Sequence, residues 1–542
     1  MQCQHFGVWP EGLPRGLPPS PNSIFDNLVA SARRYPEQVA IKYYGKELSY
    51  RELLQQVEHL AGYLHDHADI RTNDRVALYM QNAPQFVISY YAILAANAVI
   101  VPINPMCKRA ELRHILQDAN ARAVIFGQEL EAEIGAVESE CNNPALISAC
   151  YSEYHDLTTD LNVPAIVKAT GPAKVGVRWS EALKKATSPP LHTRKPEDWC
   201  IIPYSSGTTG RPKGCLHTHA SVNATVHAYP GWVGVQDGSQ ILATLPFCHV
   251  TGMQHSMNLP ILTGSTIHLM TRWNAETAAW LIERERVQHW RSITTMMIDF
   301  LSLDGVENRD LSSLQAVGGG GAQMPESVAR KMTDLIGLDY IEAYGLTETM
   351  APIHINPVHA PREQCLGIPI FDVDSRIIDP NTAAELGPND TGEIITHAPQ
   401  LFQGYWRRPE DTAAAMLELE GKQFFRTGDI GYYDDQGYFY FVDRLKRMIN
   451  VSGLKVWPAE VEAILHSHPD ISEACIVGDV DPRTGESVRA VIVLSDENSG
   501  LDNKSLEAWC RENMAAYKVP RRFETRNSLP RSAAGKVLWK DL

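Results

Sequence analysis

The sequence predicts an α/β fold, in which a large N-terminal domain of helix-covered sheets is followed by a small α+β C-terminal domain. Over most of the 542 residues, short runs rich in β-forming residues alternate with runs of helical period, as in a parallel sheet covered by helices. Hydrophobic residues make up 44% of the chain and charged residues 21%, so there is ample material for a core. Near residue 443 a run of glycine and aromatic residues ends, and a second, compact pattern of strands and helices begins.

The first elements of the chain follow this alternation. Ser49 followed by Glu52 is a capping box, which predicts a helix that carries residues 53–64. A strand, a helix and a second strand are then predicted at 76–80, 84–96 and 99–103. The apolar stretch 86–103 is interrupted by polar residues and by a proline, so it predicts a buried helix and strand rather than a membrane span.

Later elements complete the predicted organisation. Asn274 is placed to cap a helix that carries residues 278–285, and the tract 160–198, which contains Pro164, Pro172 and the pair Pro189 and Pro190, is predicted to be loop-like. Near the C-terminus, helices are predicted at 458–466 and 505–514, and strands at 474–477 and 490–494. We therefore expect a large domain over 1–442, a hinge over 443–447 and a small domain over 448–542.

Charge and cysteine usage exclude several classes of protein. Lys and Arg total 49 against 64 Asp and Glu, and a formal charge of -15 disfavours a broad basic surface for nucleic acid. The ten cysteines are scattered without zinc-ligand spacing, which indicates free thiols in a reducing compartment. The proline-rich N-terminus lacks the apolar core of a secretory signal. We expect a cytoplasmic protein without a transmembrane segment.

The strongest chemical signal is a loop of hydroxyls, glycines and one lysine between two apolar runs. It consists of Tyr204, Ser205, Ser206, Gly207, Thr208, Thr209, Gly210, Arg211, Pro212, Lys213 and Gly214. Glycines let the backbone approach phosphate oxygens, N–H and hydroxyl groups donate to them, and the lysine adds a positive charge. No G-K-[S/T] follows, so this is not a Walker A loop, and the competing interpretation is a polar surface loop.

Further motifs follow in the C-terminal direction. They are Gly318-Gly319-Gly320-Gly321-Ala322, Tyr344-Gly345-Leu346-Thr347-Glu348-Thr349, Arg426-Thr427-Gly428-Asp429, Asp443-Arg444-Leu445-Lys446 and Pro530-Arg531-Ser532-Ala533-Ala534-Gly535-Lys536. A hard carboxylate and a hydroxyl beside a phosphate loop suit Mg²⁺ with a nucleotide. Taken singly, each motif has a structural explanation as a turn, a surface ion pair or a solvated lysine. Their joint occurrence favours a shared function.

In this order the motifs resemble those of the adenylate-forming superfamily of acyl-CoA synthetases, adenylation domains and luciferases, over residues 23–542. The resemblance implies that Glu348 and Ser205 hold Mg²⁺ and that Lys536 bridges the acid carboxylate and the α-phosphate. It implies a catalytic set of Lys536, Glu348, Thr208, Lys213 and His249. The implied ATP or AMP site is Ser205, Ser206, Gly207, Thr208, Thr209, Gly210, Lys213, Gly321, Ala322, Tyr344, Gly345, Thr347, Asp429, Arg444 and Lys536.

The resemblance also implies two half-reactions in one active site. ATP and a carboxylate give an acyl-adenylate and pyrophosphate, and the thiol of coenzyme A then displaces AMP. Between the two half-reactions the small, mobile C-terminal domain swings about Lys446. This movement brings Ser452, Gly453 and Leu454 to the active site, where they form a CoA tunnel. Three positions depart from many relatives, since Arg447 replaces an aspartate, Asn450 a lysine and Trp539 a basic residue.

The acid pocket is expected among segments 246–258, 296–300, 316–323 and 344–350, as the resemblance implies. Its predicted residues are His249, Met253, Met257, Met297, Gly320 and Met350. Methionines adapt to an irregular hydrocarbon chain, although several of them can equally fill the core. Segment 246–258 has no carboxylate to pair a substrate ammonium, which disfavours a free amino acid.

We therefore expect an ATP-dependent, AMP-forming acid:CoA ligase for an apolar carboxylic acid such as a medium-chain or longer fatty acid. Its expected cofactors are ATP, Mg²⁺ and coenzyme A as co-substrate. Alternatives are a benzoate- or cinnamate-like aryl-acid CoA ligase, an acyl-AMP ligase that loads a carrier protein, and a noncatalytic nucleotide sensor. The last is disfavoured because both Glu348 and Lys536 are present. The resemblance also allows a homodimer, and the substrate class allows peripheral membrane contact.

Overall fold

The computed structural model describes residues 4–542 except 157, 186, 206–210, 452–453, 482, 497–500 and 532–536. The chain forms two compact units. The first comprises Met1–Asp374, His397–Phe425 and Gln436–Tyr438, and the second Ser375–Thr396, Arg426–Asp435 and Phe439–Leu542. The predicted α/β class is confirmed in both, and we describe each unit by itself.

One large sheet of the first unit has a parallel centre and antiparallel edges. Its order is β17 (Ile368–Pro369), β16 (Ala351–Ile355), β15 (Tyr340–Leu346), β14 (Ala316–Gly320), β13 (His289–Ser292), β11 (Gln240–Ala243), β12 (Thr266–Leu269), β1 (Val39–Tyr43) and β2 (Lys46–Ser49). The strands from β1 to β15 in this order are parallel, and both edges are antiparallel. Because β14 and β15 run in parallel, their carboxyl ends meet at one edge, which is where Gly321 and Glu348 follow.

The second large sheet is built in the same way around the predicted strands. Its order is β20 (Gly404–Tyr405), β10 (Lys213–Thr218), β8 (Trp199–Ile201), β4 (Val99–Ile103), β3 (Arg75–Tyr79), β5 (Ala121–Gly127), β6 (Ala145–Ala149) and β7 (Val177–Arg178), with β9 (Tyr204–Ser205) also paired to β10. Strand β10 is antiparallel to its neighbours. This strand therefore connects the phosphate-loop motif to β20, far along the sequence.

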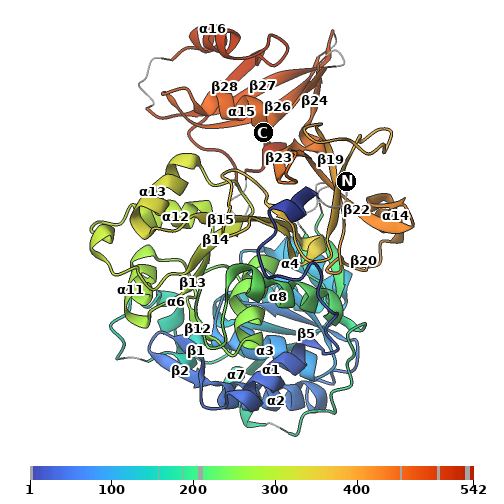
Figure 1. The fold of residues 1–542 in the computed structure, drawn as a ribbon. Coiled ribbons are helices and arrows are strands. Elements are labelled where there is room, and N and C mark those ends of the chain that lie inside the picture. The colour runs from blue at the N-terminus through green and yellow to red at the C-terminus, as the bar shows by residue number, and fades with distance from the viewer. Residues whose placement is uncertain are drawn as a thin grey trace. The chain divides into compact units, whose positions relative to one another are not determined.

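Helices cover these sheets for reasons that are visible in the sequence. All residues of α3 (Pro84–Ala95) are buried, which explains its continuous apolar run. Helix α3 packs against α2 (Tyr50–Asp66), and α2 packs against α1 (Ile24–Arg34) and α7 (Trp179–Lys184), as Figure 1 shows at the blue end of the unit. No helix of the described residues is long and apolar enough to span a membrane.

The predicted starts of two helices are confirmed by their caps. Ser49 accepts from the backbone N–H of Glu52, and the side chain of Glu52 binds the Ser49 N–H in return, so the capping box is formed at α2. Asn274 accepts from the backbone N–H of Thr277 at the start of α11 (Ala275–Glu285). The predicted loop 160–198 differs, because it contains the short helices α6 (Ala165–Lys168) and α7.

The second unit contains an antiparallel pair of long strands with helices packed beside it. Strand β26 (Ile471–Asp481) pairs with β27 (Gly485–Leu494), which also pairs in parallel with β28 (Arg522–Thr525). Helix α15 (Pro458–His466) packs on β26, and α16 (Asn503–Asn513) contributes Leu506 and Cys510 to the same core. Strands β22 (Lys422–Tyr433) and β23 (Phe439–Arg444) form an antiparallel hairpin.

Candidate functional site

Both ends of the predicted phosphate loop are fixed by strand pairing. Ser205 on β9 pairs with Lys213 on β10, and its hydroxyl lies 3.5 Å from the Lys213 carbonyl oxygen. Residues between these ends, including the predicted Ser206, Gly207, Thr208, Thr209 and Gly210, lie outside the described residues. The antiparallel pairing of β9 with β10 therefore holds Lys213 and Ser205 next to each other.

Lys213 is held by an ion pair and an aromatic ring. Its Nζ lies 3.0 Å from a carboxylate oxygen of Asp411, on α14 (Pro409–Ala415), and 5.1 Å from the centre of the Tyr405 ring. The Lys213 side chain is 18% exposed, so the ammonium remains close to solvent. An incoming phosphate must compete with Asp411 for this charge.

Glu348 lies on the short helix η7 (Thr347–Thr349) and is 8% exposed. The hydroxyl of Tyr405 donates to its Oε1 at 2.9 Å, and the backbone N–H of Phe402 donates to its carbonyl oxygen at 2.9 Å. Burial and the nearby carboxylate raise the pKa of Tyr405, so its hydroxyl remains a donor. Tyr405 therefore contacts both predicted catalytic side chains of this region, Lys213 and Glu348.

His217 fixes the backbone of the same motif. Its Nε2 donates to the carbonyl oxygen of Thr347 at 2.9 Å, and its Nδ1 lies 3.3 Å from the Ser221 hydroxyl. Burial lowers the pKa of His217 to about 4, so the imidazole is neutral at neutral pH. Because the carbonyl can only accept, the proton is on Nε2.

The glycine and tyrosine motifs form the open edge beside Glu348. Tyr344 is 9% exposed, and its ring centre lies 5.5 Å from that of His354. A Cβ added to Gly345 would lie 2.1 Å from the Ala351 carbonyl oxygen, so this position requires glycine. Gly321 has φ +91°, and both Gly321 and Ala322 are exposed at the end of β14. A flat ligand can approach the backbone there.

The predicted ribose-binding residues lie together in the second unit. Asp429 pairs with Arg444 across β22 and β23, and the Arg444 Nε lies 3.0 Å from the Asp429 Oδ1 as an ion pair without hydrogen-bond alignment. Asp429 is 1% exposed. The ion pair holds a buried carboxylate next to a cation, a combination that can bind vicinal hydroxyls.

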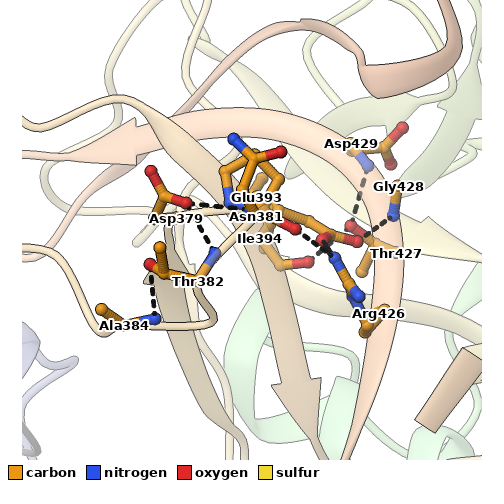
Figure 2. A network of polar contacts seen from close by, with 11 residues as sticks. Asp379, Asn381, Thr382, Ala384, Glu393, Ile394, Arg426, Thr427, Gly428 and Asp429 are labelled. Atoms are coloured by element: carbon orange, nitrogen blue, oxygen red, sulfur yellow. Dashed lines mark hydrogen bonds and ion pairs between the residues drawn. The ribbon is translucent and has the colours of Figure 1, made fainter. Parts of the chain in front are cut away.

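Glu393 organises the stretch of β22 that carries Asp429, as Figure 2 shows. Its carboxylate accepts from Arg426 Nε at 3.0 Å and from the Gly428 backbone N–H at 3.2 Å. The Thr427 hydroxyl donates to the Ile394 carbonyl oxygen at 2.7 Å and accepts from the Asp429 N–H at 3.0 Å. Glu393, which is 2% exposed, was not predicted from the sequence, since nothing around it signals a site.

The predicted hinge segment is anchored by Arg447. This guanidinium forms an ion pair with Glu462 of α15 and lies 3.7 Å from Asp443, whose other carboxylate oxygen accepts from the Ala459 N–H at 2.6 Å. Lys446 beside it is exposed. Arg447, which replaces an aspartate of many relatives, thus has a structural partner in Glu462. Of the predicted CoA-tunnel residues, Leu454 is 50% exposed, and Ser452 and Gly453 lie outside the described residues, as does Lys536.

The predicted acid-pocket residues divide into two buried clusters and an exposed edge. Met253, Met257 and Met350 belong to one apolar cluster, and Met297 belongs to another. His249 is exposed at the start of α9 (Val250–Met253), with its Nε2 3.4 Å from Asn104 Nδ2. Gly320 is partly buried at the end of β14. Three of the four methionines therefore belong to the same apolar cluster.

The described residues hold no cluster of three or more metal-ligating His, Cys, Asp or Glu side chains. Mg²⁺ bound with a nucleotide needs one or two carboxylates, phosphate oxygens and water rather than an all-protein cage. A single buried carboxylate, Glu348, beside the ends of the phosphate loop fits that requirement.

Comparison with known proteins gives the same family as the sequence motifs. The model of the AMP-binding enzyme family matches residues 28–406, and that of the AMP-binding enzyme C-terminal domain matches residues 460–536. A long-chain-fatty-acid–CoA ligase of Bacillus subtilis is 31% identical, covering 100% of this chain and 98% of the relative. A feruloyl-CoA synthase of Amycolatopsis is 31% identical, covering 99% and 98%.

A solved structure gives independent support for the fold. ATP-bound MatB from Rhodopseudomonas palustris superimposes with a TM-score of 0.84 at 24% identity, covering 96% of this chain and 98% of that one. The fold and the family predicted from the motifs are both confirmed, and so is the class of AMP-forming acyl-CoA ligase. The chain belongs to the AMP-binding enzyme family, and matches to the family lie in both its N-terminal and its C-terminal parts.

Proposed function

We propose that this enzyme joins a carboxylic acid with a large apolar part, a medium-chain or long-chain fatty acid, to coenzyme A at the expense of ATP. The observation that carries the proposal is the Tyr405 contact with both Glu348 and Lys213, which gathers a carboxylate and a cation at the ends of the phosphate loop. The long-chain-fatty-acid–CoA ligase of Bacillus subtilis, 31% identical over the whole chain, supports the choice of acid.

In the first half-reaction the acid carboxylate attacks the α-phosphorus of ATP, an acyl-adenylate forms and pyrophosphate leaves. Lys213 neutralises charge on the phosphates, and the donors of the phosphate loop, including Thr208, bind their oxygens. Tyr344 packs on the adenine, Thr347 reaches the α-phosphate, and Asp429 with Arg444 binds the ribose. Catalysis of this kind is mainly positioning and charge stabilisation.

Mg²⁺ completes the proposed site. Glu348 and the Ser205 hydroxyl would hold the ion, which would supply positive charge to the phosphate oxygens. Tyr405 keeps the Glu348 carboxylate oriented through its 2.9 Å hydrogen bond.

In the second half-reaction the thiolate of coenzyme A attacks the acyl carbonyl carbon, a thioester forms and AMP leaves. We propose that residues 448–542 turn about Lys446 between the two steps, which withdraws Lys536 and brings Ser452, Gly453 and Leu454 alongside the pantetheine arm. We propose His249, which is exposed at the start of α9, as the gate between the acid and the thiol path.

The test is AMP formation with ATP, Mg²⁺ and CoA over acids from acetate through fatty acids of increasing length to benzoate and cinnamate, with mass detection of the thioester. We expect a maximum among the saturated chains. Adenylate without CoA thioester would instead indicate a ligase that loads a carrier protein, and absence of activity on every acid would overturn the proposal.

An aryl-acid CoA ligase is a second candidate. The 31% identity to the feruloyl-CoA synthase of Amycolatopsis, over nearly the full length of both chains, favours it. A maximum on benzoate or cinnamate in the same panel would select this candidate.

We also propose that the enzyme works in the cytoplasm and forms a homodimer. The free cysteines of the described residues support a reducing compartment. Light scattering of the purified chain would measure its mass against 60.3 kDa per subunit.

A further inference from the structure

Among the described residues, a buried arginine beside the glycine strand has no ion-pair partner that balances its charge. Arg291 on β13 is 4% exposed, and its Nη2 is buried without a hydrogen-bond partner. Its contact with the Tyr229 ring, whose centre lies 5.0 Å from Cζ, is a cation–π interaction. A cation–π contact stabilises a guanidinium by less than the cost of burying it without a hydrogen-bonded partner.

The register of the sheet shows why no carboxylate of the neighbouring strands reaches it. Arg291 aligns with Gly318 on β14 and with Ile341 on β15, so these three side chains share one face. Glu342, the buried carboxylate of β15, belongs to the next row and points to the opposite face. Glu342 accepts from the Met324 N–H at 3.1 Å instead.

Gly318 lies against both a neighbouring strand and the guanidinium. A Cβ added to Gly318 would lie 2.3 Å from the Ile341 carbonyl oxygen and 2.5 Å from Arg291 Nη1, so this position requires glycine. Gly318 belongs to the strand whose end, Gly320, is predicted to line the acid pocket. The guanidinium therefore lies beside a glycine two positions along the strand from Gly320.

His255 gives the same place a second polar group without a partner. It lies on the π-helix η5 (Gln254–Asn258), within the segment predicted to line the acid pocket, and its Nδ1 is buried without a hydrogen bond. Its ring centre is 3.9 Å from that of Tyr229. Burial and the charge of Arg291 lower the pKa of His255, so the ring is neutral. π-Helical turns occur frequently at functional sites.

We propose that Arg291 binds a second carboxylate carried by the acid substrate, with His255 beside it, so that the preferred acids are α,ω-dicarboxylic acids with an apolar body. This inference rests on the proposed function and refines its substrate class. The reacting carboxylate meets ATP, methylene groups contact the methionine-lined part of the pocket, and the far carboxylate meets the guanidinium. A charge-assisted, bidentate pair is the usual partner of a buried arginine.

The experiment compares acids of equal length with one or two carboxylates: hexanoate and adipate, octanoate and suberate, dodecanoate and dodecanedioate. Thioester formation with ATP, Mg²⁺ and CoA is followed by mass detection, and kcat/KM is obtained for each acid. We expect the diacid of the best length to exceed its monoacid by about tenfold or more. In Arg291→Met we expect that ratio to fall by on the order of tenfold to a hundredfold and the monoacid to be retained or improved.

Two further variants separate specificity from folding. Arg291→Lys keeps a cation and is expected to retain part of the preference for diacids. Arg194→Met removes another buried arginine, whose guanidinium donates to the Asn73 side chain, and is expected to leave the ratio unchanged even where stability falls.

The outcomes are distinct. A preference for monoacids at every length, or a ratio that Arg291→Met does not change, overturns the inference but leaves the proposed function standing. Activation of monoacids by added inorganic phosphate would show that Arg291 takes a free anion and would also overturn it. Failure of every acid to form a thioester would instead contradict the proposed function itself.

Discussion

Tyr405 illustrates how one side chain can position two others. Its hydroxyl donates to Glu348 at 2.9 Å, its ring lies near the Lys213 ammonium, and its place is fixed by pairing with Cys215 across β20 and β10. We predict that Tyr405→Phe weakens Mg²⁺ use, because the carboxylate loses the donor that orients it. The Mg²⁺ concentration for half-maximal ATP–pyrophosphate exchange should rise by about tenfold.

Tyr438→Phe is the matched control, since its hydroxyl donates at 2.7 Å to the Ala360 carbonyl oxygen rather than to a predicted catalytic residue. Direct titration of MgATP binding by calorimetry gives a readout independent of turnover. An unchanged Mg²⁺ requirement in Tyr405→Phe would assign the hydroxyl a purely structural role.

Glu348 itself gives the sharper prediction at this scale. Glu348→Gln keeps the size of the side chain and its capacity to accept from Tyr405, but it removes the negative charge that a hard cation requires. We expect the rate of adenylation to fall on the order of a hundredfold or more, with partial recovery at high Mg²⁺. Pyrophosphate exchange at normal rates and normal Mg²⁺ would refute the metal role.

At the level of elements, buried histidines make stability depend on pH. Burial lowers the pKa of His217 on β10 and His289 on β13 to about 4, and of His268 on β12 to about 3, from an ordinary value of 6.5. Between the folded and the ordinary pKa values, the unfolded chain therefore binds protons that the folded chain does not bind. Stability is complete above about pH 6.5 and is lost as pH falls toward 4, by up to about 3 kcal/mol for His217.

Thermal unfolding followed across this range should show the midpoint falling with pH, and His217→Gln should reduce the slope. Glutamine keeps an amide donor for the Thr347 carbonyl oxygen but does not titrate. A midpoint that stayed constant from about pH 7 to pH 5 would contradict the assignment of these rings as neutral and buried.

The same scale shows what sequence patterns predict well and what they miss. The capping box at Ser49 and the apolar strand β4 are local signals, and the structure places both at the predicted residues. The short helix α6 inside the proline-containing tract has too few residues to show the hydrophobic periodicity from which a helix is predicted. Tyr405 and Glu393 could not be predicted as site residues, because each reaches its partner through strands that are distant in the sequence.

At the level of the whole molecule, the motifs predicted the family because their residue types and their order along the chain occur together. The hinge is different, since Lys446 lies in a segment whose own anchors are Asp443, Arg447 and Glu462 of the second unit. A linear sequence does not express that residues 375–396 and 426–435 group with the C-terminal part, because the chain returns to the first unit between them. Movement about the hinge remains a proposal for experiment.

Lys536 provides that experiment, because the two half-reactions require it differently. If the lysine bridges the acid carboxylate and the α-phosphate only during adenylation, Lys536→Ala should slow acyl-adenylate formation by a hundredfold or more. Thioester formation from supplied acyl-adenylate and CoA should change little, since Lys536 has then been withdrawn. Lys540→Ala, which removes a nearby cation placed over Trp539, is the control and should leave both half-reactions intact. Equal losses in the two half-reactions would mean that the C-terminal part does not turn between them.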